Sequence, residues 1–271
     1  MAGAGDSTQA GRGERFRALH EGEPFLIPNP WDAGSARVLE GLGFRALATT
    51  SSAFAFTLGR GDGEVTLDEL AAHVVTLTAA TDLPVSVDLE NGYGPAPEDA
   101  ATAIARAAVA GAVGGSIEDW DPSGHLYDAD IAAERIAAAA DTARSLGFLF
   151  TLTARAENHI RGNPDLDDTI ARLRSYEQAG ADVLYAPGLA TAEEIRAVCS
   201  AVSRPVNVLA RPHLTFAEIA GAGAQRVSVG GSLAWAGVTA FAAAAEAIRD
   251  RGDFSVLGSG KEAARLLRGG S

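Results

Sequence analysis

Short apolar runs alternate along this chain with longer, alanine-rich segments that have the periodicity of amphipathic helices. Apolar, β-branched runs that read as strands lie at 25–29, 46–50, 85–88, 115–118, 149–154, 183–186, 206–209 and 226–229. Segments with helical spacing lie at 33–42, 66–80, 97–110, 130–146, 165–179, 191–201, 215–222 and 233–249. Alternation at this spacing is typical of parallel strands joined by helical crossovers. Eight such units predict an α/β fold, a single closed (β/α)8 barrel of the TIM type.

The two ends of the chain fall outside the eight repeating units. Residues 1–13 are rich in Gly, Ala and Ser without an apolar core, and we expect a disordered lead-in there rather than a signal segment. The barrel domain is then predicted to span 14–271. Its C-terminal extension, 250–271, contains a further helix at 261–268, which a minimal barrel does not need. We expect this extra helix to pack across a subunit interface.

Composition narrows the classes of function. The chain has 271 residues and a formal net charge of −13, which disfavours nucleic acid and anionic membranes as partners. It lacks an apolar run long enough to span a membrane. The single cysteine, Cys199, permits no intrachain disulfide and favours a reducing, cytoplasmic location. Lys261 is the only lysine and lies near the C-terminus, which disfavours Schiff-base chemistry.

Carboxylates follow two neighbouring strands of the predicted barrel. Asp88 and Glu90 end the third strand, Glu118 ends the fourth, and Asp62 lies in the loop after the second. Carboxylates gathered at one end of a barrel repel each other unless a cation lies among them. We therefore predict that Asp62, Asp88, Glu90 and Glu118 hold Mg²⁺, directly or through water, with Mn²⁺ left open. The alternative is that Asp88 and Glu90 belong to an ordinary turn.

Other polar residues at the strand ends are candidates for binding a substrate. Arg155 ends the fifth strand, and its planar fork suits a carboxylate, although an internal salt bridge to Glu157 or Glu118 is the alternative. Ser51 and Ser52 offer hydroxyl and backbone N–H groups for a second carboxylate; the alternative is a helix N-cap, and the two roles can coexist. Asn207, on the seventh strand, is a further candidate. The Gly230-Gly231 turn is either a phosphate cradle or a packing turn.

The segment 121–128 after the fourth strand is polar and bounded by turn residues, which predicts a mobile lid over the metal site. His125 in this segment is a candidate general acid or base, and Ser123 is a second. The alternative is that His125, like most solitary loop histidines, has no catalytic part.

Taken together, these motifs resemble the isocitrate lyase/phosphoenolpyruvate mutase superfamily. The pieces that carry the resemblance, in order, are Thr50-Ser51-Ser52-Ala53, 61–64 (GDGE), 87–94 (VDLENGYG), 116–119 (SIED) and 153–157 (TARAE). The resemblance implies a barrel that binds Mg²⁺ and an α-keto acid or its enolate. It implies that Asp88 contacts the metal, that Asp62, Glu90 and Glu118 hold its waters, and that Arg155 binds the carboxylate with Ser51, Ser52 and Ala53. It also implies a homodimer or homotetramer with a swapped helix.

The lid departs from the superfamily pattern. Lyases of the superfamily carry a lysine and a catalytic cysteine there, whereas this chain has no lid lysine and has Ser123 in place of the cysteine. The lysine and asparagine of the phosphonate enzymes are also missing. We therefore expect an Mg²⁺-dependent lyase or decarboxylase that cleaves a C–C bond of a small 2-oxo or 2-hydroxy diacid through an enolate. The alternatives are a phosphonopyruvate-type C–P mutase or hydrolase, and a protein that binds α-keto acids without turnover.

Overall fold

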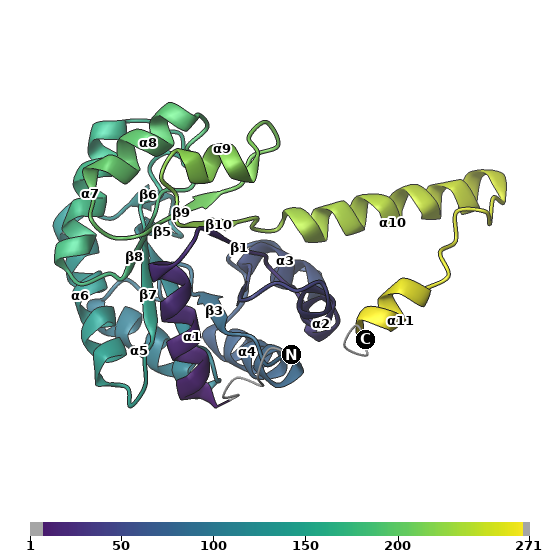
Figure 1. Cartoon of the computed structure of the whole chain (residues 1–271), viewed down its shortest axis with the longest axis horizontal. Helices are drawn as coiled ribbons and strands as arrows, with labels where there is room; N and C mark the ends of the chain where they lie inside the picture. Colours follow the sequence, from purple (N-terminus) through teal and green to yellow (C-terminus); the bar gives the residue numbers. More distant parts are fainter. Residues whose placement is uncertain (1–7, 268–271) are drawn as a thin grey trace.

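Eight parallel strands curve into a barrel in the computed structural model, which describes residues 8–267 (Figure 1). Their order in the sheet is β1-β10-β9-β8-β7-β4-β3-β2, and the N–H of Ala48 donates to the carbonyl of Pro28 (3.1 Å) where the first and last strands meet. The barrel strands are β1 (Phe25–Ile27), β2 (Leu47–Ala48), β3 (Val85–Asp88), β4 (Gly114–Glu118), β7 (Thr151–Arg155), β8 (Val183–Tyr185), β9 (Val206–Leu209) and β10 (Arg226–Ser228). The predicted (β/α)8 barrel is confirmed.

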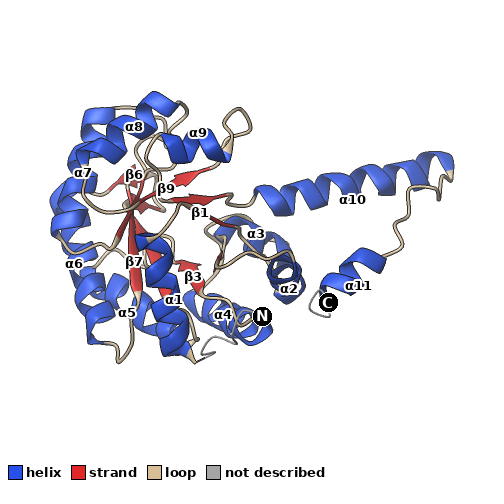
Figure 2. Cartoon of the chain, in the orientation of Figure 1, coloured by secondary structure: helices blue, strands red, loops and turns tan. Residues whose placement is uncertain are grey.

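The described residues form helices, most of which surround the strands on the outside of the barrel (Figure 2). They are α1 (Gln9–Glu21), α2 (Ala33–Gly41), α3 (Ser51–Thr57), α4 (Leu67–Ala80), α5 (Pro97–Val109), α6 (Ala129–Ser145), α7 (Leu166–Gln178), α8 (Ala192–Ala201), α9 (Phe216–Gly221), α10 (Ser232–Arg251) and α11 (Lys261–Leu267). Sequence periodicity missed α1, α3 and the hairpin of β5 (Trp120–Asp121) and β6 (His125–Leu126). Helix α3 and the hairpin are too short to show a period. Helix α1 lacks a clear apolar face because it contains two glycines and many charges.

The expectation of a disordered lead-in at 1–13 is wrong from Gln9 onward. The hydroxyl of Thr8 accepts from the N–H of Gly11 (3.1 Å), and this cap starts α1. The Gln9 amide donates to the carbonyls of Ala108 (2.7 Å) and Ala112 (2.9 Å), which anchors the helix to the barrel. Residues 1–7 of the expected lead-in lie outside the described residues.

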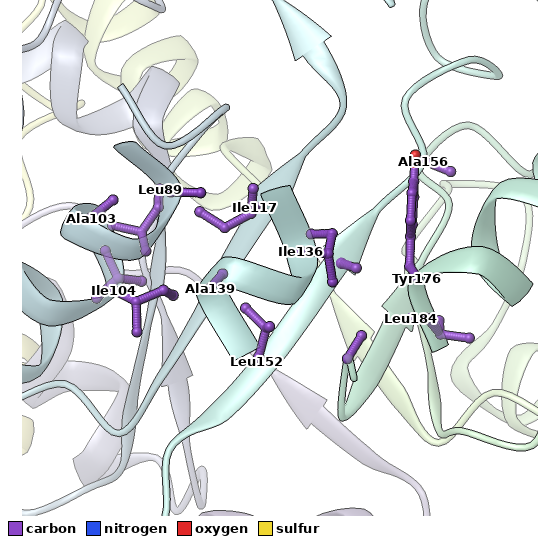
Figure 3. Packing of buried hydrophobic residues seen from close by; sticks show 14 of the residues in the cluster. Leu89, Ala103, Ile104, Ile117, Ile136, Ala139, Leu152, Ala156, Tyr176 and Leu184 are labelled. Carbon is purple, nitrogen blue, oxygen red and sulfur yellow. The ribbon is translucent and has the colours of Figure 1, made fainter. Parts of the chain in front are cut away.

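The apolar core lies between the strands and the outer helices. Ile117 and Leu152 on the strands pack against Ile104 of α5 and Ile136 of α6 (Figure 3). Side chains on the opposite face of the strands point into the barrel, and many of them are polar. Arg226 of β10 donates to the hydroxyl of Thr153 on β7 (2.9 Å), a bond that crosses the barrel because two strands separate these two. The interior is therefore hydrogen-bonded rather than filled with branched apolar layers.

The C-terminal part leaves the barrel. Figure 1 shows α10 projecting away from it and α11 returning beside α2, where Gly41 lies against the backbone of Leu266. Most of α10 is exposed, including Phe241 at 74% of its surface. The predicted extra helix is confirmed over 261–267, and its last residue, 268, lies outside the described residues. No helix within 8–267 is long and apolar enough to cross a membrane.

Candidate active site

Three strand ends bring their charged side chains together at the carboxyl end of the barrel. Asp88 ends β3, Glu118 ends β4 and Arg155 ends β7, and these strands are neighbours in the sheet. Nη1 of Arg155 lies 2.9 Å from Oδ1 of Asp88, and Nη2 lies 3.0 Å from Oε2 of Glu118 and 2.8 Å from Oε1 of Glu157. The two acids predicted to share a cation therefore face the same point. The internal salt bridges that the sequence left open for Arg155 are present.

The other two predicted metal residues line the same region. A side-chain hydrogen bond joins Asp62 to Ser51, and the hydroxyl of Tyr93 donates to Oε1 of Glu90 (3.2 Å). Glu90 has a positive φ of 49°, an unusual backbone conformation for this residue type. The conformation lets the turn direct the Glu90 carboxylate toward its neighbours instead of continuing the strand.

Two adjoining cavities open onto these acids. An outer cavity of about 290 Å³ is lined by Glu90, Glu118 and the hairpin residues Trp120 and Pro122, among others. An inner cavity of about 160 Å³ descends into the barrel past Asp88. The residues shared by both cavities are Ser51, Asp62 and Arg155. All four predicted metal residues therefore face one continuous, charged space.

Three carboxylates of this cluster, those of Asp62, Glu90 and Glu118, have raised pKa values. Burial, followed by the charges of Asp88 and Asp62, raises the pKa of Glu90 to about 7. Burial raises the pKa of Asp62, and it raises that of Glu118 well above the usual range although Arg155 opposes the shift. Burial lowers the pKa of Arg155, but the charges of Glu157, Glu118 and Asp88 outweigh it and hold that pKa high. One guanidinium does not neutralise the cluster, and this is the setting in which an added cation binds favourably.

The donor set fits Mg²⁺. Asp62, Asp88, Glu90 and Glu118 offer oxygen atoms only, and Mg²⁺ prefers oxygen ligands. Within residues 8–267, no three acid, histidine or cysteine side chains already converge as a ready-made metal cage. Mg²⁺ usually takes one or two carboxylates and keeps several waters, so this spacing suits an ion held largely through water.

The predicted carboxylate-binding residues lie at the start of α3. Thr50, in an extended conformation, is the N-cap, so Ser51 and Ser52 belong to the first helical turn and do not cap it. Ser51 and Ser52 both line the inner cavity, and the Ser51 N–H points toward Oδ2 of Asp88 (3.4 Å). Ala53 is fully buried behind them. Asn207 also lines the inner cavity, with its amide nitrogen bound to the hydroxyl of Ser228 (3.0 Å).

The predicted lid is the β5–β6 hairpin. Ser123 donates to Oδ1 of Asp121 (2.5 Å) and lies 3.0 Å from Nδ1 of His125. This hydroxyl bond, followed by the Ser123 N–H, lowers the pKa of Asp121 to about 2. Neither Ser123 nor His125 lines the two cavities, whereas Trp120 and Pro122 of the same hairpin do. The structure thus groups the two candidate proton carriers with each other but not with the acids.

Sequence reasoning missed Arg161 as a site residue. Its guanidinium lies 3.4 Å from Oε1 of Glu118 and 3.2 Å from Oε2 of Glu157, and it stacks over the ring of Trp120 (4.6 Å to the centroid). The spacing of Glu157 and Arg161, four residues apart, was the available signal. It was overlooked because Arg161 lies in the loop beyond the end of β7.

Comparison with known proteins places these motifs in a family. The model of the phosphoenolpyruvate phosphomutase family matches residues 16–249. A crystal structure from Burkholderia cenocepacia, provisionally classed as a lyase or mutase, shares 51% identity and a TM-score of 0.92, covering 96% of each chain. An oxaloacetate decarboxylase from Bradyrhizobium diazoefficiens is 32% identical over 88% of this chain and 83% of its own.

A solved structure with lower sequence identity also shares the fold of this chain. Phosphonopyruvate hydrolase, whose structure was solved with oxalate and Mg²⁺, superposes with a TM-score of 0.83 at 23% identity over 95% of each chain. At that identity the similarity shows the shared barrel alone. The match over most of the chain, together with the acid cluster at the barrel mouth, decides the assignment. The chain belongs to the phosphoenolpyruvate phosphomutase family, within the isocitrate lyase/phosphoenolpyruvate mutase superfamily that its motifs resemble.

Proposed function

We propose that this protein is an Mg²⁺-dependent lyase or decarboxylase that cleaves a C–C bond of a small 2-oxo or 2-hydroxy diacid through an enolate. The observation that carries the proposal is the convergence of Asp88, Glu118 and Arg155 on one point beside a charged cavity. The similarity to an oxaloacetate decarboxylase over most of the chain supports the reaction class. The small volume of the inner cavity, about 160 Å³, favours a substrate the size of oxaloacetate or 2-oxoglutarate.

The roles of the residues follow from their chemistry. Asp88 is the direct metal ligand in this proposal, and Asp62, Glu90 and Glu118 accept hydrogen bonds from the metal's waters. Mg²⁺, when bound, supplies Lewis-acid stabilisation of negative charge on the enolate oxygen; Mn²⁺ is the alternative ion. The substrate carboxylates bind to Arg155 and to the N–H and hydroxyl groups of Ser51 and Ser52. This binding positions the bond to be cleaved beside the metal site.

The proton-transfer residue in this proposal comes from the hairpin. Ser123 and His125 form a linked pair with Asp121 at the tip of the β5–β6 hairpin, directly beyond the Trp120 that lines the outer cavity. Closure of the hairpin over a bound substrate would bring this pair to the reacting carbon and exclude bulk water. A metal-held water is the alternative proton carrier.

A substrate panel tests the function. Purified protein is assayed with oxaloacetate, 2-oxoglutarate, malate and methyl-substituted malates, with added Mg²⁺ and with EDTA. We expect cleavage of at least one diacid and its loss in the chelator. Unchanged turnover in EDTA would reject the metal role. Phosphate release from phosphonopyruvate would favour the C–P alternative, and tight binding of an oxo acid without product would favour the non-catalytic one.

We also propose that the protein works as a homodimer or homotetramer in which α10 packs against a second copy. The helix projects from its own barrel and exposes Trp235 and Phe241, and the segment after it exposes Phe254 and Leu257. Exposed apolar side chains gathered on one projecting segment are typical of an interface. A cytoplasmic location is part of the same proposal, since the single cysteine, Cys199, is free.

A further inference from the structure

Arg226 at the start of β10 is a buried cation without a carboxylate partner. The residue is 5% exposed. Its Nε donates to Oδ1 of Asn207 (2.9 Å), its Nη2 donates to the hydroxyl of Thr153 (2.9 Å), and its Nη1 lies 3.2 Å from Nε2 of His20. All three partners are neutral, and Arg226 forms no ion pair within the described residues 8–267. Buried charges in proteins are normally paired, so this arrangement calls for a reason.

Arg226 forms part of the wall of the active-site space. Arg226 lines the inner cavity together with Asp88, Arg155 and Asn207. Burial lowers the pKa of Arg226 to about 10, which leaves the guanidinium charged at neutral pH. Three hydrogen bonds use three of the five N–H donors of a guanidinium.

A histidine of helix α1 contacts the guanidinium of Arg226. Nδ1 of His20 donates to the carbonyl of Phe16 (2.8 Å), which leaves Nε2 as the acceptor for Arg226. Burial, followed by the charge of Arg226, lowers the pKa of His20 to about 3, so the ring stays neutral and keeps accepting. The histidine that fixes Arg226 thus comes from the opposite end of the barrel to the acids.

The barrel mouth has too few unpaired positive charges to bind a substrate that carries two carboxylates. Five carboxylates meet there with the guanidiniums of Arg155 and Arg161. When all five are ionised, a bound divalent cation still leaves one negative charge in excess. The carboxylates belong to Asp62, Asp88, Glu90, Glu118 and Glu157. Among the described side chains that line the inner cavity, only Arg155 and Arg226 are cationic. Arg155 is already paired, which leaves Arg226 as the cation whose charge is not yet balanced.

We propose that Arg226 is a specificity-determining residue: its unbalanced charge at the inner end of the cavity selects substrates with two carboxylates over those with one, and His20 positions it. This inference rests on the proposed function for its substrate class and deepens it. Arg226 also accounts for the orientation of Asn207, since its Nε fixes Oδ1 of that amide and turns the amide nitrogen toward Ser228.

Calorimetry with two matched ligands tests the inference without turnover. Oxalate and glyoxylate have the same carbon skeleton and differ by one carboxylate, and both are titrated into the full-length protein with Mg²⁺. We expect Arg226→Gln to lower the affinity for oxalate by at least about tenfold and the affinity for glyoxylate by less than about threefold. Arg226→Lys, which keeps the charge, should recover much of the oxalate affinity. Arg204→Gln, an exposed arginine that does not line this cavity, is the matched control.

His20 variants provide a second test if Arg226→Gln fails to fold. His20→Phe removes the hydrogen-bond acceptor for Arg226 and should selectively lower the affinity for oxalate. His20→Gln keeps an acceptor and should lower that affinity less. Equal weakening of both ligands, no weakening of oxalate, or no preference for oxalate in the unchanged protein would each overturn the inference. An Arg226-dependent preference for oxalate in a protein that cleaves no diacid would leave the inference standing and reject the proposed reaction.

Discussion

Arg155 and Asp88 form a buried ion pair at the barrel mouth, with Nη1 of the arginine 2.9 Å from Oδ1 of the aspartate. Both side chains are about 15% exposed, and the same guanidinium also holds Glu118 and Glu157. A single cation therefore holds together the groups that are proposed to bind both the metal and the substrate. The stability of the mouth and the chemistry of the site depend on the same few charges.

Removal of this guanidinium should destabilise the fold. Arg155→Gln leaves three buried carboxylates without their main partner, which costs about 3–5 kcal/mol for a broken buried pair. Denaturant unfolding measures the loss, and added Mg²⁺ should restore part of it because it supplies positive charge to the same acids. Arg144→Gln, at an exposed pair with Asp141, is the control and should cost less than about 1 kcal/mol. Equal stability of the two variants would contradict the role given to Arg155.

Asp88 should govern metal affinity. Asp88→Asn keeps the size of the side chain and removes the charge of the proposed direct ligand, so we expect Mg²⁺ affinity to fall by about 10²-fold or more. Calorimetric titration with Mg²⁺ measures this, and diacid cleavage should fall in parallel. Asp130→Asn on the exposed first turn of α6 is the matched control. Mg²⁺ binding that survives in Asp88→Asn at full strength would place the ion elsewhere.

The hairpin pair should affect turnover more than binding. His125→Ala or Ser123→Ala removes a proposed proton carrier, so kcat should fall by about 10²–10⁴-fold. The affinity for oxalate should stay within about twofold, because neither residue lines the two cavities. Steady-state kinetics paired with calorimetry separates the two effects. A loss confined to oxalate affinity would show that the pair binds substrate instead.

His73 should make the fold sensitive to acid. Its ring stacks on Phe54 (centroids 3.8 Å apart) and Nε2 is buried without a partner, and burial lowers its pKa to about 4. Between pH 6.5 and 4 the unfolded chain binds a proton here that the folded chain does not. The free energy of unfolding therefore falls as the pH falls through this window.

The variant His73→Leu isolates this effect. From pH 6.5 to pH 5, the unchanged protein should lose about 1.5 kcal/mol more stability than His73→Leu, because the variant has no proton to bind at this position. Chemical denaturation at the two pH values measures both losses. Parallel pH dependence in the two proteins would show that His73 titrates normally in the folded state.

Helix α10 should be needed for assembly. Phe241 is 74% exposed on this helix, and Phe241→Glu places a charge on the surface proposed to meet a second copy. We expect the oligomer of the unchanged protein, measured by light scattering, to dissociate in this variant. Val109→Glu changes an 88% exposed apolar residue on α5 and should leave the assembly intact. A monomeric unchanged protein would reject the swapped-helix proposal.

Prediction from sequence succeeded where a signal repeats along the chain. The eight strands and the helices between them follow from apolar periodicity. The helix α3 and the hairpin are too short to show a period, and α1 was missed because its glycines and charges weaken its apolar face. Asp119 shows the limit at the site: it follows Glu118 directly, yet its carboxylate turns away to accept from Tyr176 (2.5 Å) and Arg172 (3.1 Å).

The sequence by itself determined the barrel and the end at which its acids gather, because strand periodicity and strand order place the carboxyl ends of parallel strands on one rim. Only the tertiary structure decided which partner each charge has. Arg155 meets Asp88 across 67 positions, and Arg226 meets His20 across 206. Contacts of this kind arise when distant segments pack, and no local pattern encodes the distance between two side chains brought together in that way.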